Sequence, residues 1–405
     1  MGQKTFPSTG AILVFLAVSV GVAAWSFPSS IGLADDPPPG DKPGSIAEGT
    51  PPSPAPDESS AEAVQERGLA PKVLRPGALS PQLLTPATPA TPLPASALPG
   101  HFAFQTFGMK YLTAVGGGGR TTDVFHTDAT SPQAWEQYRL FLILGGGVPP
   151  KFAIQTAGFN FITAVDGGGR SSDVLHTDAK QVQSWETFSF APDQYGWRNS
   201  IQTVNGHYVT AVGAGGKTAD AVHTDAVKVG TWEQFYIWKC GDLGSGVQYT
   251  MSAVSEPYGF VYAYDGGGHV NVRDGNFIFG AIGVLSDYKN RPATFDNRWQ
   301  RFRLMRQSDG SYGLLTSNGV NYVTAVQGGG LASGGITTDD LVTDRTQVQA
   351  WEKFRLVEHG SCTYVIQTSS GHYLGKKTAT TGIGLFATNV SDINSATKFR
   401  LAMVF

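Results

Sequence analysis

From residue 101 to the C-terminus, apolar and polar residues alternate in short runs that are separated by glycine-rich turns, a pattern that predicts β-strands. Each unit predicts four strands, which in the first copy read FAFQT, YLTAV, DVFHTDA and WEQYRL. One apolar position recurs in the first strand of every repeat and one in the second strand, and we predict that both lie in the core. These residues are Phe104, Ile154, Ile201, Met251, Leu314 and Ile366 in the first strand, and Leu112, Ile162, Val209, Val261, Val323 and Leu374 in the second. No window of ten or more residues shows a helical period, so we expect almost no helix there.

The same unit recurs along the chain. Tryptophan marks the clear copies at Trp135, Trp185, Trp232 and Trp351, and a diverged fourth copy carries Trp299 and an insertion near residues 274–296. A sixth copy closes the chain with Ala396 where tryptophan is expected. Self-similarity at this period predicts a repeat architecture, in which each unit buries its apolar face against its neighbours.

These repeats resemble two families. The order YxTA, glycine turn, W-x-x-F resembles the unit of fascin-like β-trefoils, and the Q-x-W at Gln133, Gln183 and Gln349 is similar to that of ricin-type lectins. Because a trefoil takes three units, the resemblance implies an all-β chain with two tandem β-trefoils of three four-stranded units each, over residues 101–241 and 245–405. The alternative is a six-bladed β-propeller, which also uses four strands per unit.

The first hundred residues have a different composition. Residues 10–25, GAILVFLAVSVGVAAW, follow Lys4 and predict that residues 1–24 are a signal peptide or an N-terminal membrane anchor. Residues 25–100 are rich in proline and cannot form a core, which predicts a disordered linker. We therefore expect a secreted or extracytoplasmic protein, tethered to the membrane if the first segment is not cleaved.

Charge adds little to this picture. The chain has 29 Lys and Arg against 32 Asp and Glu and no long basic run, so no nucleic-acid partner is expected, and membrane contact only through the N-terminal segment. Cys240 and Cys362 are the two cysteines, and a single disulfide and two separate buried thiols both remain open. The stretch AVGAGGKT fits a loose phosphate-loop pattern, but the neighbouring copies indicate a glycine turn.

The most specific motif is HTD, which recurs in the first three copies. The candidate ligand-binding residues are His126, Asp128, His176, Asp178, His223 and Asp225, with the cationic turn tips Arg120, Arg170 and Lys217. Thr343-Asp344 persists in the fifth copy, where Val342 replaces the histidine. We therefore predict a structural role for Thr-Asp, with the carboxylate accepting backbone N–H bonds, and a ligand role for the histidine.

Other site chemistry is disfavoured. One His-x-Asp pair per unit supplies too few ligands for a metal, and no cofactor is expected. Asp123 with Glu136 could form a carboxylate pair, but identical pairs in every unit do not suit an enzyme with one cleft. The repeated tryptophans could stack on sugars, although one per unit beside Phe or Tyr is more typical of core.

These features predict a non-catalytic binding protein. The lectin resemblance implies that its ligand is a glycan or polysaccharide bound at repeated shallow sites on the first trefoil. The first alternative is a fascin-like protein-interaction or cross-linking module of the actin-bundling type, with a protein partner. The second is a propeller-type hydrolase.

Overall fold

The computed structural model describes residues 93–145, 149–194, 196–254, 259–270, 272–274, 277–279, 282–285, 296–331, 340–377 and 383–405. The expected signal peptide or anchor, most of the expected linker and much of the insertion near 274–296 lie outside these residues. All of the described residues belong to one compact unit. Among the described residues, no helix has the length and apolar character needed to cross a bilayer.

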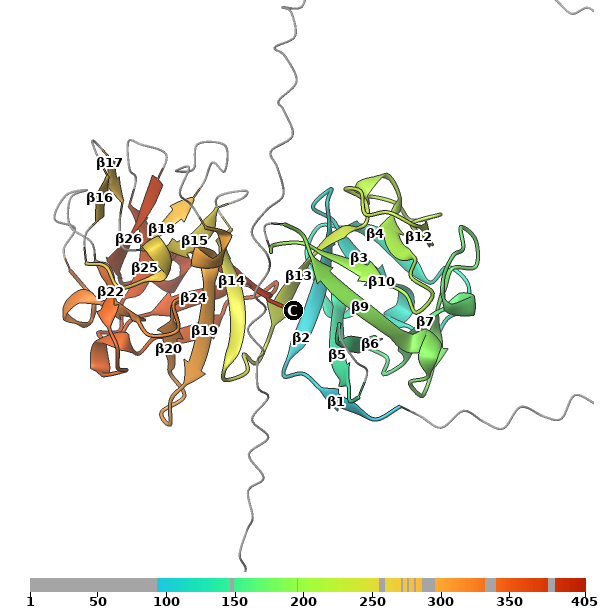
Figure 1. Cartoon of the computed structure of the whole chain (residues 1–405), viewed down its shortest axis with the longest axis horizontal. Helices are drawn as coiled ribbons and strands as arrows, with labels where there is room; N and C mark the ends of the chain where they lie inside the picture. The colour runs from blue at the N-terminus through green and yellow to red at the C-terminus, as the bar shows by residue number, and fades with distance from the viewer. Residues whose placement is uncertain are drawn as a thin grey trace, which may run out of the picture. The chain divides into compact units, whose positions relative to one another are not determined.

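The first body is formed by the first three repeats and is coloured blue to green in Figure 1. Its strands are β1 (Ala95–Ala97), β2 (His101–Thr106), β3 (Tyr111–Ala114), β4 (Phe125–Ala129), β5 (Gln137–Ile143), β6 (Lys151–Gln155), β7 (Phe161–Ala164), β8 (Leu175–Ala179), β9 (Thr187–Pro192), β10 (Asn199–Gln202), β11 (Tyr208–Ala211), β12 (Val222–Ala226) and β13 (Gln234–Cys240). The first and fourth strands of the repeats pair in a closed antiparallel ring, β2–β5–β6–β9–β10–β13 and back to β2. The second and third strands of each repeat form the outer hairpins β3–β4, β7–β8 and β11–β12.

The second body repeats this plan with the last three repeats. Its strands are β14 (Val247–Ala253), β15 (Phe260–Ala263), β16 (Val272–Asp274), β17 (Phe277–Phe279), β18 (Ile282–Leu285), β19 (Arg301–Arg306), β20 (Tyr312–Leu315), β21 (Tyr322–Ala325), β22 (Leu341–Arg345), β23 (Arg355–Glu358), β24 (Tyr364–Gln367), β25 (Tyr373–Lys377), β26 (Ile383–Val390) and β27 (Phe399–Met403). The ring runs β14–β19–β20, crosses by the bridge Tyr312↔Phe354 to β23, and returns through β24 and β27. Strands β16 and β17 of the insertion pair with each other.

This pairing confirms the all-β prediction. Within the described ranges the helical segments are short 3₁₀ turns: η1 (Val115–Gly117), η2 (Ala134–Glu136), η3 (Val165–Gly167), η4 (Ser184–Glu186), η5 (Val212–Ala214), η6 (Tyr264–Gly266), η8 (Asn297–Gln300), η9 (Val326–Gly328), η10 (Ala350–Glu352) and η11 (Ile393–Ser395). A propeller blade would pair four strands of one repeat, whereas here strands of different repeats close each ring.

Each ring encloses its own core. All twelve core positions predicted from the strand pattern are buried, those of the first three repeats in the first core and the others in the second. Phe405 departs from this division, because its ring lies 4.8 Å from that of Phe190 and 5.3 Å from that of Phe152 in the first body. The last residue of the chain therefore completes the core of the first three repeats.

The repeat motif is explained by a buried hydrogen-bonded clamp. In the first repeat, Thr113 of YLTA donates to Glu136 Oε1 at 2.7 Å, and Glu136 Oε2 accepts from Gln133 N at 2.7 Å. The same two bonds recur at Glu186, Glu233 and Glu352. Burying a carboxylate is costly unless its oxygens are bonded, so the threonine and the glutamate have to occur together.

The last residues of the expected linker include a strand, β1 (Ala95–Ala97). Strand β1 pairs with β5, and Leu98 N donates to Leu140 O at 2.8 Å. Pro99 O accepts a hydrogen bond from the buried Lys239. The proline-rich composition of the region led to the prediction of disorder, although Ala95–Ala97 has no proline and is free to pair at a sheet edge.

Several contacts connect the two bodies. Cys240 and Cys362 form a disulfide with a Cα–Cα distance of 4.4 Å. Trp197 stacks on Phe260 with ring centroids 3.9 Å apart, and Trp238 pairs with Ala402 across β13 and β27. These residues belong to a third apolar cluster, so the joint near residues 241–246 is more than a flexible connection.

Candidate functional site

The glycine run of each repeat makes a turn that fits against the next repeat. Gly118 has a φ of +97°, and a Cβ at this position would lie 2.3 Å from Thr156 Oγ1 of the second repeat. Gly168 and Gly215 make the same approach to Thr203 and Thr106. Only glycine permits both the backbone angle and the close contact, which explains why the glycines recur at one place.

The threonine of HTD links neighbouring repeats. Thr177 Oγ1 accepts from Arg120 N at 3.1 Å and donates to Arg120 O at 3.3 Å, and the two backbones also pair. Thr224 bonds Arg170 and Thr127 bonds Lys217 in the same way, which closes a cycle around the three repeats. In the second body Thr343 keeps this role with His269. The predicted structural role thus belongs to the threonine.

The aspartates of HTD do not carry that role. Asp128, Asp178 and Asp225 are exposed, and none of the three accepts a backbone N–H bond in the described part of the chain. Thr127 and its two equivalents point inward and are fully buried, so strict alternation along the strand directs the following carboxylate outward. The prediction that the carboxylate holds the loop was therefore wrong.

The histidines pair with carboxylates that lie three residues earlier. His126 Nε2 donates to Asp123 Oδ1 at 2.9 Å, and the pairs His176–Asp173 and His223–Asp220 are each 2.7 Å long. The hydrogen bond from His223 lowers the pKa of Asp220. Each aspartate has a φ near +50°, a conformation that Asp adopts more readily than most residues.

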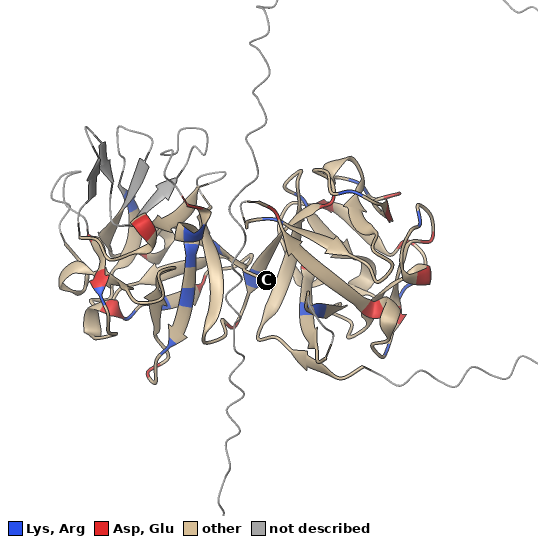
Figure 2. Cartoon of the chain, viewed as in Figure 1, with Lys and Arg blue, Asp and Glu red and all other residues tan. Residues whose placement is uncertain are grey.

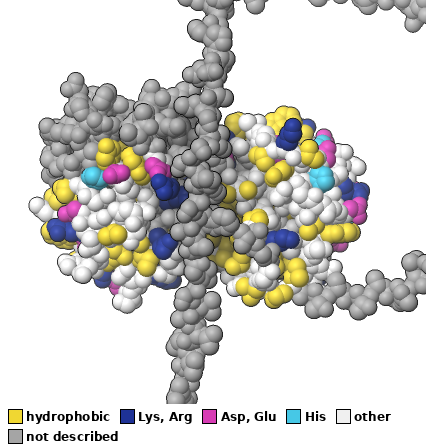
Figure 3. Space-filling view, in the orientation of Figure 1, with side chains coloured by type: hydrophobic (Ala, Val, Ile, Leu, Met, Phe, Trp, Pro, Cys, Tyr) yellow, Lys and Arg dark blue, Asp and Glu magenta, His cyan; other side chains and the backbone are white. Residues whose placement is uncertain are grey.

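The cationic turn tips complete these clusters. Arg120 lies 3.3 Å from Asp123, Arg170 lies 3.6 Å from Asp173, and Lys217 is 4.0 Å from Asp220. Figure 3 shows histidine, acidic and basic side chains side by side at the surface of the first body, and Figure 2 shows that its charges are sparse and mixed in sign. The cations are therefore largely compensated within their own loops.

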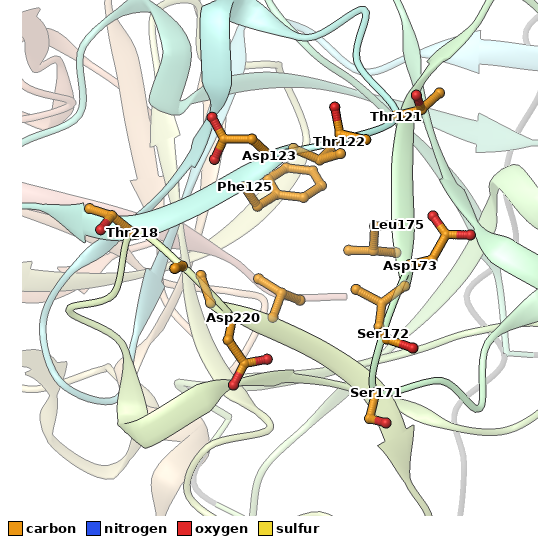
Figure 4. A pocket seen from close by; sticks show the side chains of 15 residues that line it. Thr121, Thr122, Asp123, Phe125, Ser171, Ser172, Asp173, Leu175, Thr218 and Asp220 are labelled. Carbon is orange, nitrogen blue, oxygen red and sulfur yellow. The ribbon is translucent and has the colours of Figure 1, made fainter.

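The loops of all three clusters surround one pocket, which we call the axial pocket. It has a volume of about 510 Å³ and is lined by Thr121, Thr122, Asp123, Val124, Phe125, Ser171, Ser172, Asp173, Val174, Leu175, Thr218, Ala219, Asp220, Ala221 and Val222. In Figure 4 the labelled Ser and Thr side chains stand around its edge, Phe125 and Leu175 lie inside, and the three carboxylates point away from its centre. Phe125, Leu175 and Val222 are buried and form an apolar floor.

The hydroxyl groups at this edge have no hydrogen-bond partner among the described residues. The side chains of Thr121, Thr122, Ser171, Ser172 and Thr218 are exposed, and none forms a hydrogen bond with the described part of the protein. A ligand in the axial pocket would thus meet an apolar floor and a ring of free donors and acceptors. The corresponding loops of the second body fall partly outside the described residues, at 332–339 and 378–382.

The structure places both the carboxylate pair and the tryptophans considered from the sequence. Asp123 and Glu136 have separate partners, with Glu136 buried in its clamp and Asp123 exposed beside His126. Trp135, Trp185, Trp232 and Trp351 are 49%, 44%, 46% and 43% exposed, so the core prediction was wrong for them and right only for Trp299, which is buried. The reason is the 3₁₀ turn before the fourth strand, which buries the glutamate and turns the tryptophan outward.

Sequence reasoning missed Asp123, Asp173 and Asp220 as partners of the histidines, and it missed the pocket floor. The signal was present, because D-x-x-H recurs with the same spacing in the first three repeats. Among the described residues, no group of three or more His, Cys, Asp or Glu side chains is arranged to hold a metal ion.

No family model matches this sequence, and a search of curated proteins finds no match. Among solved structures, the chain is similar to a mosquitocidal holotoxin, with a TM-score of 0.30 and 8% identity over 75% of this chain and 34% of that one. A designed threefold-symmetric protein, ThreeFoil, has a TM-score of 0.29 and 17% identity over 38% of this chain and 97% of its own.

A third similar structure is a non-toxic homologue of type II RIPs from bitter gourd, Momordica charantia, in complex with α-methyl-D-galactoside. Its TM-score is 0.24, with 10% identity over 75% of this chain and 96% of that chain. Likeness at these scores carries no argument about ligand or mechanism. The functional argument therefore depends on the pocket and on the contacts around it.

Proposed function

We propose that this protein is an exported, non-catalytic carbohydrate-binding protein made of two tandem β-trefoils over residues 101–241 and 245–405. A closed ring of strands with three outer hairpins is the arrangement that a trefoil requires, and it supports this assignment for both bodies. The apolar run at residues 10–25 and the disulfide support export, because disulfides persist in oxidising compartments.

The axial pocket is the main evidence for the chemical class of the ligand. Its volume of about 510 Å³ lies within the range of roughly 300–1,000 Å³ that is typical of small-ligand sites. A sugar ring has an apolar C–H face and hydroxyl groups at its edge, which complement the floor of Phe125, Leu175 and Val222 and the hydroxyls around it. The three carboxylates point away from the centre of the pocket and are paired with histidines, and no other charged residue lines the pocket. No charged group is therefore available to pair with a charged sugar, and a neutral sugar is favoured over an anionic one.

The three repeats contribute to one site in this proposal. His126, His176 and His223 act by holding the aspartates turned away from the pocket, and Arg120, Arg170 and Lys217 compensate their charge. The proposal therefore places one site on the axis of the first body, where the sequence predicts three separate shallow sites.

The test begins with a glycan array probed with the full chain, which selects a neutral oligosaccharide for titration. The variant Ser172→Trp/Ala219→Trp places two indoles at equivalent exposed positions of the pocket edge, and we expect it to lose binding. Thr130→Trp adds an indole to an exposed loop outside the pocket and is the matched control. Unchanged binding by the double variant, with an unchanged melting temperature, would reject the axial pocket as the site.

A further inference from the structure

A second pocket, which we call the Trp351 pocket, lies in the fifth repeat. It has a volume of about 390 Å³ and is lined by Arg345, Thr346, Gln347, Gln349, Ala350, Trp351 and Glu352. One continuous segment forms it, from the end of β22 through η10, and Trp351 is 43% exposed there. The edge of its indole approaches Gly328 of the glycine turn, where a Cβ would lie 3.4 Å from Trp351 Cδ1.

Arg345 distinguishes this pocket from its counterparts. The residue that ends the third strand is Ala129, Ala179 and Ala226 in the first three repeats, and arginine in the fifth. The Arg345 side chain is 59% exposed, and its nearest carboxylate oxygen, Asp344 Oδ1, is 3.7 Å from Nε. This contact is too long for a hydrogen bond, so the guanidinium donors remain available to a ligand.

Glu352, the acidic residue that lines the pocket, is already engaged. Glu352 is buried, its Oε1 accepts from Thr324 Oγ1 at 2.9 Å, and its Oε2 accepts from Gln349 N at 2.8 Å. The Gln349 side chain accepts from the backbone of Glu352. The polar groups that remain free at the opening are those of Arg345, Thr346 and Gln347. They offer neutral donors and acceptors and one positive charge, which lies 3.7 Å from the Asp344 carboxylate without a hydrogen bond to it.

We propose that the Trp351 pocket binds a sugar that carries a carboxylate, such as a uronic acid in a polysaccharide. The exposed indole offers a flat apolar surface for the ring, and the guanidinium can pair with the carboxylate through two parallel hydrogen bonds. Thr346 and Gln347 are placed to bond the ring hydroxyls. The proposal deepens the carbohydrate-binding function, but it concerns the other body and a different ligand charge.

Calorimetric titration of the full chain with tri-galacturonic acid tests this site, and the methyl ester of the same trisaccharide is the uncharged probe. We expect Arg345→Ala, which introduces the residue of the first three repeats, to weaken binding of the acid by roughly tenfold or more, because a charge-assisted pair is lost. Trp351→Ala should weaken binding of the acid as well. Arg355→Ala removes an exposed arginine of β23 outside the pocket and should leave binding unchanged.

The ester should bind wild type about as weakly as the acid binds Arg345→Ala. Equal binding of acid and ester, wild-type affinity in Arg345→Ala, or no binding of the acid at millimolar concentration would each overturn the proposal. Failure of the axial pocket is separable, since Ser172→Trp/Ala219→Trp should leave binding of the acid intact. Arg345→Ala should conversely leave neutral-glycan binding intact.

Discussion

Replacing Thr177 with valine tests the hydrogen-bonded cycle that holds the first three repeats together. Valine keeps the shape of threonine but removes the only acceptor described for Arg120 N, at 3.1 Å, and the donor to Arg120 O, at 3.3 Å. Thr177 is fully buried, so water cannot replace the hydroxyl. A donor left without a partner in such a place costs roughly 1–3 kcal/mol, and we expect the free energy of unfolding to fall by that amount.

The assay is urea denaturation of the oxidised protein, read as a shift of the midpoint at constant slope. Thr122→Val is the matched control, because its hydroxyl is exposed and unbonded, and a change within about 0.5 kcal/mol is expected. The triple change at Thr127, Thr177 and Thr224 should lose roughly 3–9 kcal/mol, a large part of the ~5–15 kcal/mol of a typical domain. Equal stability of Thr177→Val and Thr122→Val would refute the structural role of the threonine.

Three further predictions concern the rest of the fold. Burial lowers the pKa of Lys239 from 10.5 to about 8, so the unfolded chain binds more protons between these values, and stability should rise as the pH increases from 8 toward 10. Lys239→Met should abolish this rise in a pH series of melting temperatures. The disulfide joins residues 122 apart, and Cys240→Ser with Cys362→Ser should cost ~4–5 kcal/mol in denaturant titrations, whereas no loss would count against the bond. A chain that begins at His101 should melt below one that begins at Leu93, because it lacks β1 and the Pro99 carbonyl that binds Lys239; equal melting would show that β1 is dispensable.

The strand pattern was sufficient for the fold class because every core position depends on local alternation. Leu112, Ile162 and Val209 lie on one face of their strands, and burial of that face needs no knowledge of distant partners. Trp135 was misplaced because a 3₁₀ turn interrupts the alternation just before the fourth strand. The contact between Phe405 and Phe190 could not be predicted from the local sequence pattern, because it joins the end of the chain to the second repeat.

The candidate site was found only in part for a related reason. His126, His176 and His223 stood out because they recur, yet their partners Asp123, Asp173 and Asp220 were considered only as unsuitable catalytic acids. The axial pocket exists because three segments that are about fifty residues apart meet around one axis. Neither the alternation nor the spacing of one repeat indicates that meeting point.

The ratio of bound neutral oligosaccharide to protein tests the central claim most directly. Calorimetric titration of the full chain should give one neutral ligand per chain, because residues from three repeats form a single axial pocket. The same titration of Ser172→Trp/Ala219→Trp should give no neutral binding, and Thr130→Trp should keep one. Three equivalent neutral ligands per chain, or one that survives the double change, would contradict the account.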